Sequence, residues 1–165
     1  MTGPEPTPNT ADLCDAHPDA VRVLSGGLHD YGARPAFHGE VTTLRSIDDW
    51  RPVYAVLQEE GRGRVLVVDG GGSREHAILG ERLLGTAERQ GWAGVVIWGS
   101  VRDTAQTRRI AAGLRALATC PMRGELGGVP ERDVALLLGG VRVAPGDHLY
   151  ADADGVIVAD RAIVA

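Results

Sequence analysis

The chain has 165 residues, of which 44% are hydrophobic and 24% charged, as expected for one soluble globular domain with a core of its own. The formal net charge is −5 and no basic block is interleaved with aromatic residues, which argues against a nucleic-acid-binding surface. We find neither a signal peptide nor an apolar run of the roughly 20 residues that cross a membrane, so we expect a cytoplasmic protein without a membrane segment.

The chain begins with a segment that we predict to be a disordered lead-in. Met1–Asn9 contains three prolines and no apolar periodicity, and residues 10–165 are predicted to form a single domain. Thr10 is placed to cap a helix that covers Ala11 to about His17. A second short helix is predicted over Asp19–Leu24.

The middle of the chain alternates between strands and helices. A strand is predicted over Ala36–Arg45 and a helix over Pro52–Glu60, with proline in its first turn. Two short β-branched runs, Val65–Val68 and Ala93–Trp98, are predicted as buried strands. The segment between them is predicted as a helix packed on one face, with apolar residues at Ala77, Ile78, Leu83, Leu84 and Ala87. Strand, helix and strand make a βαβ unit with parallel strands and a right-handed crossover.

The C-terminal third is predicted to be mostly strands. A helix over Thr104–Ile110 with Asp103 as its N-cap and a strand over Leu114–Thr119 precede a glycine-rich loop, Pro121–Pro130. Short strands follow at Asp133–Leu138, Val141–Val143 and Gly155–Val158. The sequence therefore predicts an α/β fold with a βαβ centre and a β-rich C-terminal third.

Ligands of βαβ units bind beyond the carboxyl ends of the strands, and both predicted central strands are followed there by unusual residues. Asp69-Gly70-Gly71-Gly72 only loosely meets the G-x-G-x-x-G pattern, so it is either a nucleotide-binding loop or, as we favour, a tight turn. Arg102-Asp103 after the second strand can hold a carboxylate and a hard divalent cation, or it can be an ion pair with a helix cap. Gly80 is either tolerated inside a helix or marks the start of a second helix whose free N–H groups can bind an anion.

The remaining reactive side chains show no motif of their own. The five histidines are not spaced as metal ligands and are predicted to be surface or packing residues. Cys14 and Cys120 form no C-x-x-C pair and are predicted to be small, buried or half-buried residues.

The order of these motifs resembles one known family. Glu81, twenty intervening residues and then Arg102-Asp103 resemble the D/E-x20-R-D signature of the regulator of ribonuclease E activity A (RraA)-like proteins, which include the class II 4-hydroxy-4-methyl-2-oxoglutarate aldolases. The resemblance covers roughly residues 10–160. Further segments that carry it are Thr10–Leu13, Phe37–Gly39, Val65–Ser73, Gly91–Val96, Gly139–Val141 and Pro145–Asp152.

The resemblance implies a compact swivelling β/β/α domain assembled as a trimer or a dimer of trimers, with the site between subunits. By position, the backbone of Gly80, Glu81, Arg82 and Leu83 and the side chain of Arg102 would bind the carboxylate of pyruvate. Asp103 would bind Mg²⁺ or Mn²⁺ and Glu81 would orient water at the ion. This implies a divalent-metal lyase that cleaves 2-keto acids to pyruvate, by retro-aldol cleavage or by decarboxylation of oxaloacetate.

The sequence departs from the family pattern in two places. Pro121-Met122-Arg123 replaces a basic Pro-Arg-Lys pattern, and the sequence ends at Ala165 without the longer C-terminal helix that supplies an acid/base residue in the family's aldolases. We therefore expect decarboxylation, which needs less proton transfer, to be retained better than aldol cleavage. The other function that the resemblance implies is that of a non-catalytic regulator that binds a ribonuclease and inhibits it.

Overall fold

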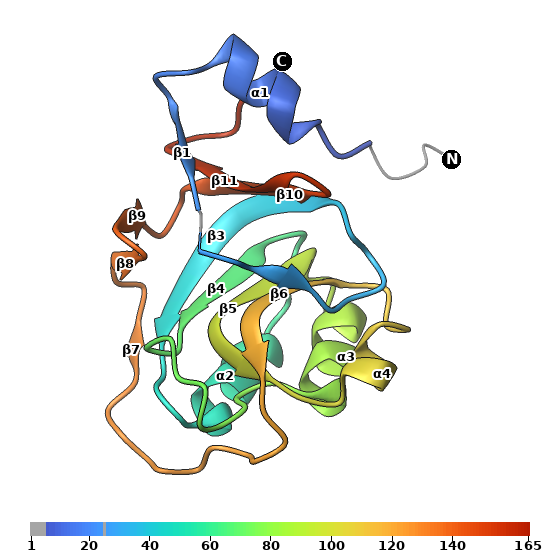
Figure 1. Cartoon of the computed structure of the whole chain (residues 1–165), viewed down its shortest axis with the longest axis vertical. Coiled ribbons are helices and arrows are strands. Elements are labelled where there is room, and N and C mark those ends of the chain that lie inside the picture. The colour runs from blue at the N-terminus through green and yellow to red at the C-terminus, as the bar shows by residue number, and fades with distance from the viewer. Residues whose placement is uncertain (1–5, 25) are drawn as a thin grey trace.

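A parallel four-stranded core organises the molecule (Figure 1), and the computed structural model describes residues 6–24 and 26–165. Strands β3 (Phe37–Arg45), β4 (Val65–Asp69), β5 (Gly94–Val101) and β6 (Gly113–Thr119) lie side by side in that order and pair in parallel. The central strands β4 and β5 are buried on both faces, as expected for continuous β-branched runs in a parallel sheet. The predicted βαβ centre is confirmed.

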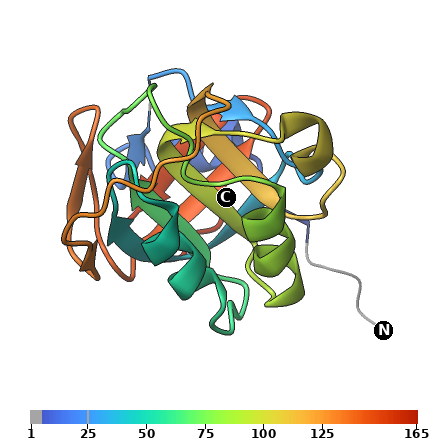
Figure 2. The same cartoon turned by 90° about the horizontal axis from the view of Figure 1, so that it is seen from below.

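Three helices connect these strands. They are α2 (Trp50–Leu57), α3 (Glu81–Arg89) and α4 (Thr104–Thr107). Figure 2 shows α2 and α3 packed next to each other on one face of the sheet. Apolar residues from both helices and from the strands form one core cluster; the helices contribute Val53, Val56, Leu57, Leu83, Leu84 and Ala87. α2 begins at Trp50, earlier than the predicted Pro52, because the Asp49 side chain accepts a hydrogen bond from the Arg51 N–H and caps it.

The sheet continues beyond β3 with antiparallel strands. In the order β1-β11-β10-β3, the added strands are β1 (Val21–Val23), β11 (Gly155–Ala159) and β10 (His148–Asp152). Their apolar residues form a second cluster with the hairpin of β8 (Leu136–Leu138) and β9 (Val141–Val143). Short strands β2 (His29–Asp30) and β7 (Glu131–Arg132) pair with β6 and β3. The β-rich C-terminal third is thus confirmed.

Helix α1 (Thr10–Ala16) packs on the outside of the β10–β11 pair (Figure 1). Its N-cap is Asn9, whose side chain accepts from the Asp12 N–H, and not Thr10 as predicted. Thr10 lies in the first turn and donates from both its N–H and its hydroxyl to the Asp152 carboxylate, at 2.7 Å each. The predicted lead-in falls partly outside the described residues, since residues 1–5 are not described.

Two predicted helices are wrong in whole or in part. The segment Asp19–Leu24 contains strand β1 instead of a helix. Pairing with β11 provides hydrogen-bond partners for its backbone N–H and C=O groups, and this outweighs the local preference for a helix. The helix predicted over Thr104–Ile110 is only the short α4. Strand β10 was not predicted. Among the described residues, no helix is long and apolar enough to span a membrane.

Candidate functional site

A small pocket lies where α3 begins and β5 ends, and it contains most of the predicted site residues. Its volume is about 70 Å³. It combines the start of α3, the turn after β5 and a residue of the loop after β6. The lining residues are Trp50, Ala77, Ile78, Leu79, Gly80, Arg82, Leu83, Arg102, Asp103 and Arg123.

Asp103 connects the two segments that the signature places twenty residues apart. Its backbone is left-handed (φ 58°), a conformation that aspartate adopts more readily than most residues. It occupies the N-cap position of α4 as predicted, but its side chain does not cap that helix. Oδ2 instead accepts a hydrogen bond of 3.1 Å from the Glu81 N–H in the first turn of α3. The positive end of the α3 dipole therefore stabilises the Asp103 carboxylate.

Gly80 is the N-cap of α3, so this glycine marks the start of a helix, as one alternative held. The helix is shorter than predicted, because Ala77 and Ile78 precede it in extended backbone whose N–H groups bond to Met122 and Ser100. Its φ of −141° is open to any residue, so the backbone angle does not require glycine. The lack of space does require glycine, because a Cβ atom at this position would lie 2.4 Å from Asp103 Oδ2 and 3.3 Å from Arg102 Cγ. The absent side chain is what lets the carboxylate reach the helix N-terminus.

Arg102 and Asp103 do not form the ion pair that was the structural alternative. Among the described residues, neither side chain takes part in a salt bridge within 4.0 Å. The Arg102 backbone N–H donates to the Leu79 carbonyl at 2.9 Å, and its Nη1 donates to the Pro121 carbonyl at 3.3 Å. The guanidinium is thus half-buried beside the pocket without a carboxylate to neutralise it.

Two further arginines make the pocket positive. The Arg82 guanidinium lies 4.7 Å from the ring centre of Tyr54 and donates to its hydroxyl at 3.2 Å. Arg123 lies 5.4 Å from the ring of Trp50 and is ion-paired with Glu125. A pocket with three guanidinium groups suits an anion with more than one carboxylate.

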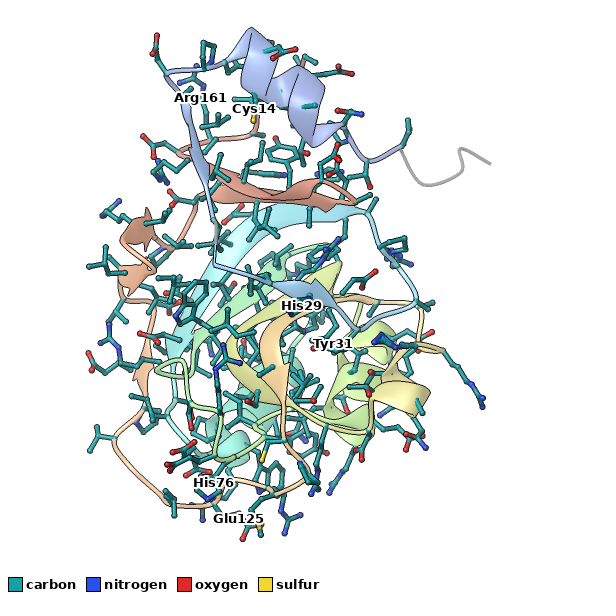
Figure 3. All side chains as sticks on the ribbon, in the orientation of Figure 1. Cys14, His29, Tyr31, His76, Glu125 and Arg161 are labelled. Carbon is teal, nitrogen blue, oxygen red and sulfur yellow. The ribbon has the colours of Figure 1, made fainter. Side chains whose placement is uncertain are left out.

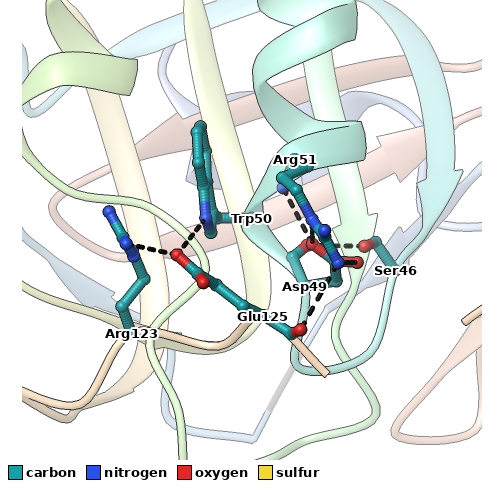
Figure 4. A network of polar contacts seen from close by, with 6 residues as sticks. All are labelled: Ser46, Asp49, Trp50, Arg51, Arg123 and Glu125. Atoms are coloured by element: carbon teal, nitrogen blue, oxygen red, sulfur yellow. Dashed lines mark hydrogen bonds and ion pairs between the residues drawn. The ribbon is translucent and has the colours of Figure 1, made fainter. Parts of the chain in front are cut away.

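A polar network fixes the loop that carries Arg123 to the start of α2 (Figure 4). Arg51 donates to both oxygens of Asp49, at 2.9 and 2.8 Å, and reaches the Glu125 carbonyl at 3.3 Å. The hydrogen bonds from Arg51 hold the pKa of Asp49 below its usual value, against the effect of burial. Trp50 Nε1 donates to Glu125 at 3.2 Å. Sequence reasoning missed Trp50 and Arg123 at the pocket, because they lie 53 and 20 residues from Asp103 and no local pattern connects them.

The glycine-rich segment after β4 is a tight turn. The N–H groups of Gly70 and Gly72 both donate to the Trp98 carbonyl at 3.0 Å, and the Gly71 N–H donates to Asp69 at 2.8 Å. Gly71 and Gly72 both have φ near 67°. These N–H groups already have partners in β5 and in Asp69, which favours the turn over the nucleotide-binding alternative.

The donor set around Asp103 fits a hard divalent cation. Asp103 is exposed, and its Oδ2 already accepts a hydrogen bond from an N–H group, so the protein would supply few ligand atoms to the ion. The ion would therefore keep most of its bound water, as Mg²⁺ prefers. The room at Gly80, which a Cβ would fill, leaves this carboxylate accessible from the pocket. Glu81 lies next to it with an exposed side chain.

Comparisons with known proteins identify the family of the chain. The family model described as "RraA-like: Aldolase/RraA" matches residues 10–158. A protein of Alkalilimnicola ehrlichii named "Putative 4-hydroxy-4-methyl-2-oxoglutarate aldolase" is 45% identical over 155 residues, which cover 94% of this chain and 96% of that protein.

Two solved structures are similar over nearly the whole chain, each at a TM-score of 0.91 and 42% identity. One is the "RNA-processing inhibitor RraA" of Thermus thermophilus, with 100% of this chain and 97% of that chain covered. The other is named an S-adenosylmethionine:2-dimethylmenaquinone methyltransferase, from Geobacillus kaustophilus, with 94% and 96% covered. The family-model match over residues 10–158, together with the sequence and fold similarity over almost the full length, establishes that the chain belongs to the aldolase/RraA family.

Proposed function

We propose that this protein is a divalent-metal-dependent carbon–carbon lyase that releases pyruvate from 2-keto acids, of the 4-hydroxy-4-methyl-2-oxoglutarate aldolase and oxaloacetate decarboxylase type. The observation that carries the proposal is Asp103, held at the N-terminus of α3 beside an Arg102 with no carboxylate partner. The names of similar curated relatives support the same reaction class.

The pyruvate part of the substrate would bind through its carboxylate. The N–H groups in the first turn of a helix have no hydrogen-bond partner within the helix. In α3, the N–H group of Glu81 already donates to the Asp103 carboxylate. The N–H groups of Arg82 and Leu83 then remain for the substrate carboxylate, together with the fork of the Arg102 guanidinium. Arg123, from a different loop, would bind the second carboxylate that both candidate substrates carry, in exchange for its ion pair with Glu125.

Asp103 would hold Mg²⁺ or Mn²⁺, and the ion would supply a Lewis acid that polarises the 2-keto oxygen. Breaking the bond between C3 and C4 leaves its electron pair on the enolate of pyruvate, which then takes a proton at C3. Arg102 lowers the energy of this anionic species by holding its carboxylate in place. The Glu81 carboxylate would orient water beside Asp103.

Decarboxylation is the reaction that these residues support best. It releases CO₂ and requires only the final proton, whereas aldol cleavage also requires a base to remove the proton of the 4-hydroxyl group. Among the described residues, the pocket lining includes no histidine and no carboxylate besides Asp103. Oxaloacetate is therefore the first substrate to test.

The second candidate function is that of a ribonuclease inhibitor. Its support is the structural similarity to a protein named as an RNA-processing inhibitor. In either case we expect a trimer or a dimer of trimers, as the family resemblance implies. The two functions differ in whether Arg102 and Asp103 are needed.

The test is release of pyruvate from oxaloacetate by the purified protein, with and without Mg²⁺ or Mn²⁺. We expect Asp103→Asn to abolish metal-dependent turnover, because it removes the charge that binds the ion and nearly keeps the shape. Arg102→Lys should chiefly raise KM, by a loss of about 1.5–3 kcal/mol, since lysine keeps the charge but lacks the planar fork.

Matched controls are Asp15→Asn and Arg109→Lys, both at exposed positions outside the pocket. They should leave turnover unchanged. Wild-type activity in Asp103→Asn and Arg102→Lys would show that the site is misplaced. Absence of metal-dependent activity of the wild type on any 2-keto acid would favour the inhibitor function.

A further inference from the structure

Three side chains that can bind metal ions meet at a second place, outside the pocket lining. Asp48 precedes α2, and Glu75 and His76 lie between the turn after β4 and α3. One ligand atom of each lies within 4.8 Å of the others. Figure 3 shows His76 at the same end of the molecule as Glu125, far from Cys14 in α1.

Two of the ligand atoms are buried and unsatisfied. Asp48 Oδ1 and His76 Nδ1 have no hydrogen-bond partner, although the atoms themselves are shielded from solvent. Their side chains are only 12% and 22% exposed. A buried acceptor or donor without a partner costs about 1–3 kcal/mol, so the arrangement calls for a third group between the two atoms.

The distance between these atoms suits a shared metal ion. Asp48 Oδ1 and His76 Nδ1 are 3.4 Å apart, too long for a normal hydrogen bond. Oxygen and nitrogen ligands bound to zinc at about 2.0–2.1 Å in a tetrahedron lie ~3.3 Å from each other. The exposed Glu75 carboxylate can turn toward the same point.

Backbone contacts hold the three loops in this arrangement. Gly124 packs so closely that a Cβ there would lie 2.5 Å from the Asp48 carbonyl oxygen and 2.9 Å from His76 Cβ. The Leu126 N–H donates to the Asp48 carbonyl at 3.0 Å, and the Ala77 N–H donates to the Met122 carbonyl at 2.7 Å. The ligands are therefore brought together by the fold and not by a flexible surface.

We propose that Asp48, Glu75 and His76 bind a divalent transition-metal ion, with Zn²⁺ as the preferred ion and water as the fourth ligand. One imidazole and two carboxylates suit zinc better than Mg²⁺, which prefers oxygen ligands alone. The site is separate from Asp103 and independent of the proposed reaction. A bound ion would join the loop before α2 to the segment that leads to Ala77, and so stabilise the parts of the pocket wall formed by Trp50 and Ala77.

The experiment is titration of chelator-treated protein with ZnCl₂ by calorimetry, together with thermal unfolding and the visible absorption of bound Co²⁺. We expect one Zn²⁺ per chain, a rise in Tm with zinc, and a tetrahedral Co²⁺ spectrum. His76→Gln and Asp48→Asn should each weaken zinc binding by at least about 10–100-fold, the loss usually seen for groups that only support a ligand. Glu75→Gln, at an exposed position that folding does not require, should also weaken it.

Two controls separate this site from the others. His38→Gln removes one member of the close pair in which His38 Nδ1 lies 3.1 Å from His148 Nε2, and it should leave zinc binding unchanged. Asp103→Asn should do the same, and excess Mg²⁺ should not displace zinc. The proposal is wrong if zinc binding is absent, if it survives in Glu75→Gln and His76→Gln, or if His38→Gln abolishes it. It is also wrong if zinc leaves Tm unchanged in the wild type, because the cluster would then be only an ion pair.

Discussion

At the scale of single residues, the site depends on the absence of one side chain. Gly80 leaves the space through which the Asp103 carboxylate reaches the first turn of α3. Gly85, in the same helix, has no such role, because a Cβ there would meet only the flexible end of Arg89 at 3.2 Å. The two glycines therefore respond to alanine in opposite ways.

We predict that Gly80→Ala destabilises the protein by about 1–3 kcal/mol and displaces Asp103, since the new methyl group overlaps its carboxylate. Gly85→Ala should stabilise it by up to about 1 kcal/mol, the difference in helix propensity. Urea denaturation of both variants measures the two effects, and the pyruvate-release assay should show a loss of activity in Gly80→Ala only. Equal stability of the two variants would contradict the proposed close contact.

At the scale of elements, the pairing of β3 with β10 places two histidines next to each other. Tyr150 lies opposite His38, and His148 lies opposite Glu40. The ring of His38 stacks on Tyr150, and its Nδ1 is 3.1 Å from His148 Nε2. Burial lowers the pKa of His148, the neighbouring His38 lowers it further, and Glu40 opposes the shift.

This depressed pKa predicts how stability changes with pH. Below about pH 6.5, the ordinary pKa of histidine, the unfolded chain binds a proton that folded His148 resists. The contribution of neutral His148 to the free energy of unfolding is therefore complete above that pH. It is lost progressively as the pH falls toward the lower pKa of His148 in the folded state. Urea denaturation between pH 5 and pH 8 should show this fall, and His148→Gln should reduce it. His29→Gln, which removes an exposed histidine, should leave the fall unchanged.

Elements with strong local patterns were predictable from the sequence, whereas those decided by distant pairing were not. The β-branched runs of β4 and β5 specify their structures locally, and so does the apolar spacing of Leu83, Leu84 and Ala87 in α3. Ala77 and Ile78, which were predicted for the same helix, precede it. Strand β1 exists because Val21–Val23 pairs with β11 more than 130 residues away, so no window of local sequence reveals it. Thr10 was predicted to be the N-cap of α1, a position that Asn9 occupies. The prediction failed because the hydrogen-bond partner of Thr10, Asp152, lies 142 residues away in the sequence.

The same rule applies to the site. Gly80, Glu81, Arg102 and Asp103 were assigned to one site through the family signature, and the βαβ unit places the start of its helix near the end of its second strand in agreement with it. Arg123 and the Asp48–Glu75–His76 cluster could not, because they depend on how the loop after β6 folds back over two other loops.

At the scale of the whole molecule, several large apolar side chains are exposed at the end that holds the pocket. Ile47 and Met122 are more than half exposed, and Leu126 and Val129 are 67% and 91% exposed. They lie on the loop before α2 and on the loop after β6, the two loops joined by the network of Figure 4. Large apolar side chains exposed on two neighbouring loops suit a site of protein association.

We predict that the protein is a trimer, or two trimers, in which these loops contact a second copy. Light scattering coupled to size-exclusion chromatography at micromolar concentration should give three or six times the chain mass of 17.4 kDa. Leu126→Glu should dissociate the assembly and reduce pyruvate release, because it places a charge in the contact next to the pocket. The matched change Val164→Glu, at a position that is 77% exposed near α1, should leave the mass and the activity unchanged. A stable wild-type monomer would refute the trimer, and a Leu126→Glu trimer with full activity would show that a different face is used.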